Sequence, residues 1–351
     1  MAYTTIKKPS DYFNTILYTG DNSSPRTITG VGFQPDMNWS KIRSEVNDHW
    51  VSDAVRGANK IIRPNGTDDE LVNGSGGYIS SFNSDGYVIA SGSASNNNFN
   101  KSSGTMVSWN WKANGAGSSN TDGSITSTVS ANTTSGFSIV SYTGNLTSGA
   151  TVGHGLDSAP KMVIVKNRSI TEDWFVLHTS ASATAGSYLK LNLTDAVSSG
   201  NSIVFNNTNP TSTVFTVGSV NGTNGSGNNM IAYCFADVKG FSKFGSYTGN
   251  GNADGTFIYT GFKPAFVLIK ANASADWYLI DNKRSTFNVM EASLKANTSD
   301  AESTTIQDMD FLSNGFKPRS TSGSTNGSGT TYIYMAFAEE PLVGDNPATA
   351  R

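Results

Sequence analysis

The chain has 351 residues, with 24 Lys and Arg against 27 Asp and Glu and a formal net charge of -3 at pH 7. Charged residues make up 15% of the chain, well below the roughly 25% of an ordinary soluble domain. A single Cys excludes internal disulfides and Cys-based metal centres. The lack of a basic block argues against nucleic-acid binding, and no apolar run approaches the ~18 residues that a membrane span needs.

The N-terminus reads MAYTTIKKPSDYF, with two Lys and no apolar stretch behind them, so it does not resemble a secretory signal peptide. The rest is rich in Asn, Gly, Ser and Thr, as in proteins that act outside cells. Exported folds usually carry a signal or disulfides, and this sequence shows neither. A virion protein, assembled in the host cytoplasm and released by lysis, fits both observations. Non-classical export is the alternative.

Internal similarity divides the chain into three repeats, because five sequence blocks recur three times in one order. Each repeat opens with Tyr-Thr-Gly, at 18–20, 142–144 and 247–249. A block with Pro before an apolar run follows, starting at Gly32, Gly155 and Gly261. A Trp comes next, at Trp50, Trp174 and Trp277, and then a strand-like block from Ser84, Thr211 and Ser313. An aromatic strand closes each repeat, as TMVSWNWKA, NMIAYCFAD and TYIYMAFAE.

The repeats predict five regions along the chain. They are 1–113 (N-terminal region and first repeat), 114–135 (linker), 136–239 (second repeat), 240–342 (third repeat) and 343–351 (C-terminal tail). The linker is rich in Gly, Ser and Asn, a composition typical of a flexible segment. The second and third repeats follow each other directly, so we expect them to pack as a rigid pair.

The pattern within each repeat predicts an all-β fold. Candidate strands are about four to eight residues long and rich in Val, Ile, Tyr and Phe, and the Asn-Gly dipeptides between them suit tight hairpin turns. Roughly five or six strands per repeat suffice for a small β-sandwich of the lectin or jelly-roll kind, with little helix. Short helices are expected near 53–60 and 288–296. The repeats could instead share strands across two larger sheets, and the sequence leaves both arrangements open.

Several blocks resemble a repeat family in structural proteins of tailed bacteriophages, especially phages of marine bacteria. These blocks are GFKPAFVLIK, DWYLIDN, VRGANK, SDGYVIASG and TYIYMAFAEEP, together with the opening MAYTTIKKPSDYF. Members of that family are described as tail fibres or lectin-like virion proteins, so the resemblance implies a non-enzymatic virion component without catalytic residues. The first repeat departs from the pattern, because MNWSKIRS, from Met37, has a polar break in its strand. We expect a less regular first sandwich there, with a surface adapted for docking.

Catalytic and metal-binding motifs are sparse. His49, His154 and His178 are far apart in sequence and lack a second ligand at metal-binding spacing. Cys234 lies in a closing strand, where a buried, inert thiol is expected. Residues 250–255 resemble the start of an EF-hand loop, but Gly261 stands where the bidentate Glu belongs, so we expect a turn, with a loose Ca²⁺ contact as the alternative. We expect neither a cofactor nor a metal.

A pair of carboxylates for glycoside hydrolysis would need to converge in space. The acids closest to strand signals are Asp85, Asp173, Asp276, Asp281, Asp308 and Asp310. An enzyme needs one constellation, whereas this chain repeats one scaffold three times, so a glycan-cleaving depolymerase is the least favoured hypothesis.

Sugar binding through aromatic platforms is also considered. Trp50, Trp174 and Trp277 recur at matching positions, as core residues would, so core packing is favoured for them. Binding would instead use the loops before the closing strands, at 93–103, 220–229 and 320–330, unless these are simply solvated loops. The candidate contact residues for glycan or partner are Asn96, Asn97, Asn98, Asn221, Asn224, Asn228 and Asn326.

These observations favour a virion structural protein, most simply a tail-fibre or receptor-recognition component that contacts host surface glycans. The alternative is a capsid decoration or structural joint protein that binds no glycan. Expected partners are other virion proteins, further copies of the chain and a host glycan, with no nucleic acid and no membrane insertion. We expect a homotrimer, although three repeats could also form a pseudo-symmetric monomer.

Overall fold

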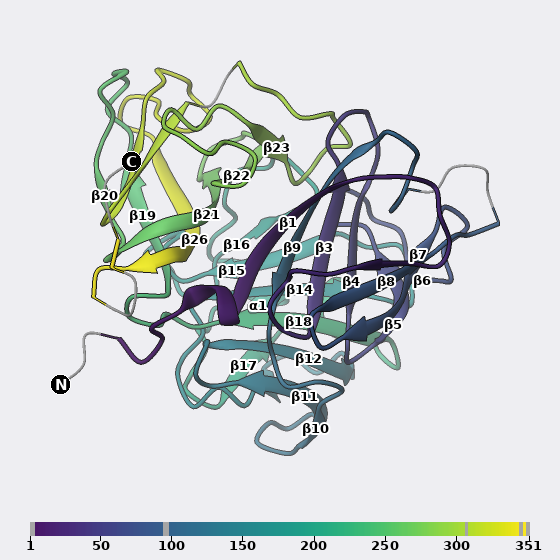
Figure 1. Ribbon diagram of the computed structural model, residues 1–351. Coiled ribbons are helices and arrows are strands. Elements are labelled where there is room, and N and C mark those ends of the chain that lie inside the picture. The colour runs from purple at the N-terminus through teal and green to yellow at the C-terminus, as the bar shows by residue number, and fades with distance from the viewer. Residues whose placement is uncertain (1–3, 94–97, 306–307, 344–346, 349–351) are drawn as a thin grey trace.

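The computed structural model describes residues 4–93, 98–305, 308–343 and 347–348. The chain forms an all-β fold in which each repeat builds its own antiparallel sandwich (Figure 1). Among the described residues there is no helix of the length and hydropathy needed to cross a membrane. The two short α-helices are α1 (Ser202–Phe205) and α2 (Asn221–Asn224), and a 3₁₀ turn, η1 (Pro9–Asp11), precedes the first strand.

The first repeat has a six-stranded sheet in the order β1-β9-β3-β4-β5-β6, covered by a smaller sheet in the order β2-β8-β7. The strands of the large sheet are β1 (Phe13–Thr19), β3 (Met37–Ile42), β4 (His49–Asp53), β5 (Gly57–Ile62), β6 (Leu71–Val72) and β9 (Thr105–Trp111). Those of the small sheet are β2 (Arg26–Ile28), β7 (Tyr78–Asn83) and β8 (Gly86–Ala90).

The second repeat has a seven-stranded sheet in the order β10-β11-β12-β18-β14-β15-β16, covered by the pair β13-β17. The large sheet contains β10 (Ser118–Asn120), β11 (Ser127–Asn132), β12 (Phe137–Thr143), β14 (Met162–Asn167), β15 (Trp174–His178), β16 (Tyr188–Lys190) and β18 (Asn229–Phe235). The small sheet contains β13 (Ala150–Gly153) and β17 (Val214–Val217).

The third repeat has a five-stranded sheet in the order β19-β26-β21-β22-β23, covered by β20-β25-β24. The large sheet contains β19 (Ser242–Thr248), β21 (Phe262–Ala271), β22 (Trp277–Asp281), β23 (Ser293–Lys295) and β26 (Thr331–Pro341). The small sheet contains β20 (Ile258–Tyr259), β24 (Met309–Leu312) and β25 (Gly315–Pro318). The repeats therefore form three sandwiches rather than two shared sheets.

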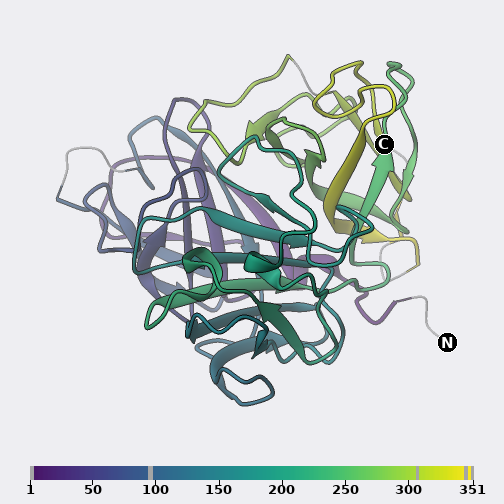
Figure 2. The ribbon, with the colours of Figure 1, turned by 180° about the vertical axis from the view of Figure 1, so that it is seen from behind.

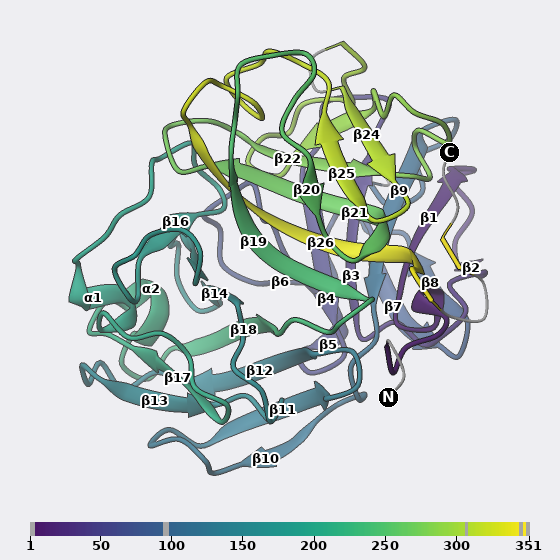
Figure 3. The same ribbon diagram turned by 90° about the vertical axis from the view of Figure 1, so that its left-hand side faces the viewer.

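In the part of the chain that the structure describes, the buried apolar residues form four hydrophobic cores. Each sandwich has its own core between its large and small sheets. The three large sheets come together around the middle of the molecule (Figures 2 and 3). The fourth core contains buried residues of all three repeats. Its aromatic centre includes Phe13, Trp111, Phe235, Phe266 and Phe337, with Phe13 stacked on Phe337 at 4.9 Å between ring centroids. Apolar burial of this size is the main stabilising contribution to the association of the repeats.

The prediction of a flexible linker at 114–135 is wrong, because β10 and β11 lie within this segment and extend the second repeat's sheet beside β12. The weak local signal is overridden by ladder hydrogen bonds to β12 and by burial of Val129. The helices expected near 53–60 and 288–296 are also wrong, since these residues belong to hairpins of β4 with β5 and of β22 with β23.

The polar break in the first repeat is buried rather than available for docking. All six residues of β3 are buried. Its polar side chains satisfy one another inside the sandwich, because Asn38 donates to Asn110 at 2.8 Å and Ser40 donates to Asn38 at 2.6 Å. The first sandwich thus replaces part of an apolar layer with a hydrogen-bonded one, and the expected docking surface is not there.

Candidate functional site

The Tyr-Thr-Gly tripeptide ties the two loops at one end of each sandwich together. In every repeat the Tyr hydroxyl donates to the backbone oxygen of the residue before a buried Asn. The pairs are Tyr18–Phe99, Tyr142–Thr223 and Tyr247–Thr325, at 2.7, 2.6 and 2.6 Å. The glycine of the tripeptide is required because the loops approach closely: a Cβ at Gly20 would lie 1.9 Å from the backbone oxygen of Lys101.

The buried Asn in each repeat organises the same loops from inside. These residues are Asn100, Asn224 and Asn326, each with 0% exposure. The side-chain oxygen of each accepts from the backbone N–H that follows the glycine, at 3.1, 2.9 and 3.1 Å. Their amide groups donate to loop oxygens. The prediction that Asn224 and Asn326 contact a ligand is therefore wrong, because both side chains are enclosed and fully engaged within the loops.

The remaining predicted contact residues lie in different settings. Asn221, the first residue of α2, is exposed, and Asn228, between α2 and β18, is half-buried. Asn98 is half-buried, and its side-chain oxygen accepts from Asn47 at 3.2 Å. Asn96 and Asn97 lie outside the described residues. In the second repeat the exposed residues of the predicted loop at 220–229 are Asn221, Ser226, Gly227 and Asn229, with Asn228 half-buried among them.

The interfaces between repeats follow one pattern around a closed ring. At two interfaces an indole N–H donates to a backbone oxygen of the neighbouring repeat: Trp174 to Arg63 and Trp277 to Lys190, both at 2.9 Å. At the third, His49 takes the place of the Trp and bonds the backbone oxygen of Lys295. Trp50, which the sequence aligns with the other two, lies one residue away and packs in the first sandwich's own core. The sequence-based alignment of Trp50 is thus wrong by one position.

Two backbone hydrogen bonds reinforce each interface at matching places. Between the first and second repeats they join Glu70 N–H to Arg168 and Glu172 N–H to Thr67. The equivalents join Val197 to Asn272 and Ala275 to Thr194, and Glu302 to Arg43 and Asn47 to Ser299. The first repeat contacts the second, the second repeat contacts the third, and the third repeat contacts the first. The three repeats therefore form an approximately threefold ring.

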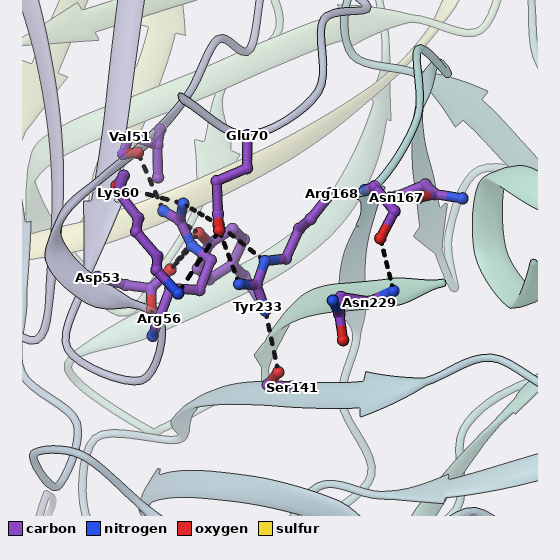
Figure 4. Close-up of polar contacts among 11 residues, drawn as sticks. Val51, Asp53, Arg56, Lys60, Glu70, Ser141, Asn167, Arg168, Asn229 and Tyr233 are labelled. Carbon is purple, nitrogen blue, oxygen red and sulfur yellow. Dashed lines mark hydrogen bonds and ion pairs between the residues drawn. The ribbon is translucent and has the colours of Figure 1, made fainter. Parts of the chain in front are cut away.

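A buried ion network crosses the interface between the first and second repeats (Figure 4). Arg56 pairs with Asp53 on its own turn and with Glu70 at 3.1 Å, and both Arg56 and Asp53 side chains are fully buried. Glu70 receives two further bonds from Arg168 of the second repeat, each at 2.8 Å. Burial alone would raise the pKa of Glu70, but the bonds and charges of Arg168 and Arg56 outweigh it and hold this pKa below its usual value. Tyr233 closes the network by donating to Asp53 at 2.7 Å.

The interface between the third and first repeats carries the same network. Arg284 pairs with Asp281 at 2.5 Å and with Glu302 at 3.1 Å. Glu302 accepts two bonds from Arg43, at 2.9 and 2.6 Å. At the interface between the second and third repeats the equivalent positions hold uncharged residues: His178, Ala181, Val197 and Asn272. The sequence signal for the network is the Asp-x-x-Arg spacing in SDAVRG and IDNKRS, which the sequence analysis missed.

Three equivalent lysines, Lys41, Lys166 and Lys270, are buried at the interfaces. Their ammonium groups donate to backbone oxygens; Lys166, for example, bonds Thr67 of the first repeat at 3.0 Å and Glu172 at 2.9 Å. Burial lowers the pKa of each of these lysines from 10.5 to about 8. Lys166 and Lys270 each donate to a backbone oxygen of the neighbouring repeat, whereas Lys41 donates to Ile42 and Glu45 of its own repeat.

The thiol and the candidate calcium turn that the sequence singles out both have structural settings. Cys234 is buried, and burial raises the pKa of its thiol, which disfavours a nucleophilic thiolate. In the part of the chain that the structure describes, no three His, Cys, Asp or Glu residues lie together as a metal site. The turn at 250–255 ties its carboxylate, Asp254, to Lys317 at 2.6 Å and to Arg319 at 3.1 Å.

The acids considered for glycoside hydrolysis do not gather in one place. Asp173 and Asp276 pair with Lys190 and Lys295 in different repeats. Asp281 belongs to the ion network, and Asp85 accepts the backbone N–H groups of Gly30 and Gly32 in the first repeat. Asp85, Asp173 and Asp276 thus bond within their own sandwiches, whereas Asp281 also accepts from the Trp109 indole of the first repeat at 3.0 Å.

The fold and these interfaces define a class of protein built as a ring of three β-sandwich repeats. The chain matches a family model described as a domain of unknown function (DUF7483) over residues 8–341. It therefore belongs to that family, and the family spans all three repeats. A search of curated proteins gave no match.

Proposed function

We propose that this protein is a non-enzymatic structural component of a bacteriophage virion and acts at the tail as a receptor-recognition component. The phage part of the proposal rests on the repeat blocks that resemble tail proteins. The structural support is the closed ring. The three sandwiches bury their shared apolar core and their interface hydrogen bonds against one another, so these surfaces are not available to other proteins. Charged residues make up only 15% of the chain, and the loops carry exposed Asn, Ser and Thr side chains that can form hydrogen bonds with a ligand.

Recognition would use the loop ends that Tyr-Thr-Gly and the buried Asn hold in place. A rigid loop loses little conformational entropy when a ligand binds, which favours affinity. Exposed Asn, Ser and Thr side chains, such as Asn221, can hydrogen-bond sugar hydroxyls. Individual contacts of this kind are weak, so many copies on one particle would supply the strength.

A capsid decoration protein is the second candidate, and one observation favours it. The six Trp residues, which would be the best sugar platforms, are all buried: Trp39, Trp50, Trp109, Trp111, Trp174 and Trp277. A protein that only joins other virion proteins would not need an exposed Trp. This candidate shares the ring and differs in its place on the particle.

Immunogold electron microscopy separates the candidates. Antibodies raised against the purified chain are applied to particles of a phage that encodes it, and adsorption to host cells is measured with and without Fab fragments. Gold at the tail and Fab-inhibited adsorption are expected. Gold over the capsid with unchanged adsorption would replace the proposal with decoration, and unlabelled particles would contradict a virion role altogether.

A further inference from the structure

The chain treats the equivalent edges of its three large sheets in three different ways. The edge strands are β1, β12 and β19, which pair with the closing strands β9, β18 and β26. In the second repeat the edge is occupied, because β11 pairs with β12 along its length and β10 pairs with β11. An unpaired edge is a template for another strand, so the other two edges merit comparison.

The third repeat closes its edge with local contacts. The backbone N–H of Phe244 donates to the carboxylate of Asp237 at 2.8 Å. The backbone oxygen of Thr248 accepts from the Thr256 hydroxyl at 2.8 Å, and Ser242 N–H donates to the backbone of Val238 at 2.9 Å. The outward-facing N–H groups of Ser242 and Phe244 and the oxygen of Thr248 on β19 are thus already engaged.

The first repeat leaves residues 13–17 of this edge open, while at the end of β1 the backbone oxygen of Thr19 accepts from the Arg26 guanidinium at 2.8 Å, as Thr248 does from Thr256. Tyr12 accepts from Lys112 at 2.9 Å, and Gly20 donates to Gly104 at 2.8 Å, so even-numbered residues of β1 direct their backbone groups toward β9. Because direction alternates along an antiparallel strand, the backbone groups of 13, 15 and 17 point outward. Among the described residues no backbone partner is recorded for these groups. Leu17, at the centre of the edge, is 37% exposed.

A pocket of about 190 Å³ lies against this edge, between the first and third repeats. Its walls include Asn14 and Thr15 of β1 and Asn282 and Glu340 of the third repeat. Neighbouring strand residues point to opposite faces, so a pocket lined by both Asn14 and Thr15 sits at the strand edge. The buried side-chain oxygens of Thr15 and Asn282 have no partner among the described residues, which is unusual for buried polar atoms.

In the second repeat the strand β11 occupies the equivalent sheet edge. Ser130 of β11 accepts from Asn114 N–H at 2.8 Å, and Asn132 donates to Ala113 at 3.3 Å, both just beyond the closing strand of the first repeat. On its other side β11 packs so closely on Gly155 that a Cβ there would lie 3.2 Å from Val129. At Gly32, the counterpart of Gly155, a Cβ would meet only the backbone oxygen of Ser10, at 3.6 Å.

We propose that β1 binds an extended segment of a different polypeptide as an added antiparallel strand, seated as β11 is seated on β12. The segment would be uncharged and rich in Ser, Thr and Asn, with Val or Ile at the position of buried Val129, because that is the chemistry the matching seat accepts. A second copy of this chain is the weaker choice, since its β11 is already paired on both sides. Backbone hydrogen bonds supply the affinity in such strand addition, and alternate side chains supply the specificity.

The test uses the full-length chain and a labelled peptide of residues 125–134, ITSTVSANTT, which contains the β11 sequence. Fluorescence anisotropy measures peptide binding, and amide hydrogen exchange reports protection of residues 13–19. Leu17→Pro removes an outward N–H that β1 does not use internally, and Leu17→Lys adds an edge charge in case the Pro variant misfolds. Ser246→Pro, at the equivalent position of β19, is the matched control.

Saturable binding with new protection of 13–19 is expected. The affinity should fall at least about tenfold in both Leu17 variants, because a blocked edge cannot pair, and should stay within about twofold in Ser246→Pro. Absence of saturable binding, or equal binding by the Leu17 variants, would overturn the proposal. Self-association that is lost in Leu17→Pro, seen by sedimentation without peptide, would assign the seat to a second copy instead.

Discussion

The imidazole Nε2 of His49, in the first repeat, lies 3.0 Å from the backbone oxygen of Lys295 in the third. Nδ1 of the same ring accepts from the indole of Trp39 at 3.0 Å, so Nε2 carries the proton and donates it to Lys295. This bond occupies the place of the indole bonds of Trp174 and Trp277 and closes the ring of repeats. It also makes one interface of the ring depend on a neutral histidine.

Acid should therefore destabilise the protein below the ordinary pKa of histidine. Burial lowers the pKa of His49 from 6.5 to about 3 and that of His178 to about 4. Between pH 6.5 and 4 the unfolded chain binds more protons than the folded one, so the free energy of unfolding falls as the pH falls, by about 1.4 kcal/mol for each unit of pKa difference. Urea titrations at neutral pH and near pH 4.5 measure the loss.

The variant His178→Gln provides the control for this acid effect. It should be less stable than the wild type at neutral pH, because the bond from His178 to Tyr334 is altered. Its further loss on acidification should be smaller, since one titrating group is gone. Equal losses in the two proteins would show that His178 does not report the acid transition.

Mild alkali should have the opposite effect through the buried lysines. The pKa of Lys166 is lowered by burial to about 8, so between pH 8 and 10 the unfolded chain binds more protons and the free energy of unfolding rises with pH. Above about pH 10 the buried tyrosines, whose pKa values are raised, reverse the trend. Lys166→Met should make this rise smaller without removing it, because Lys41 and Lys270 still contribute, as measured by urea unfolding at several pH values. A rise of unchanged slope would exclude Lys166 as its source.

Breaking the ion network should cost far more than breaking a surface pair. Glu70→Gln leaves Arg56 and Arg168 without their shared carboxylate, and loss of a buried partner costs about 3–5 kcal/mol. Asp11→Asn removes the exposed pair with Lys8 and should cost less than about 1 kcal/mol. Chemical denaturation of both variants measures the difference, and similar small losses would contradict a buried network.

Substitutions of a buried and of an exposed loop Asn should differ in their effect on the free energy of unfolding. Asn224→Ala leaves several buried loop groups unpaired, and it should lower the free energy of unfolding by about 1–3 kcal/mol. Asn221→Ala removes an exposed side chain and should change stability by less than about 0.5 kcal/mol. Thermal and urea unfolding provide the measurement. A neutral Asn224→Ala would refute the role given to the buried Asn.

The sequence could predict the all-β fold because strand periodicity and turn residues are local signals. It could not predict how the repeats meet. The bond between Arg43 and Glu302 spans 259 residues, and nothing local at either residue announces the other. The sequence could not show that His49 replaces the interface Trp, because the adjacent Trp50 aligns with Trp174 and Trp277 instead. The strand β11 was missed because its polar sequence becomes a strand only through its pairing with β12.

The closed ring is tested most directly by a double-mutant cycle on Arg43 and Glu302, which join the first and third repeats. The free energy of unfolding is measured for the wild type, Arg43→Met, Glu302→Gln and the double variant. The ring predicts that the double variant loses less stability than the two single variants together, with a coupling of about 1 kcal/mol or more. Strictly additive losses would mean that the two side chains do not touch and that the ring is open at this interface.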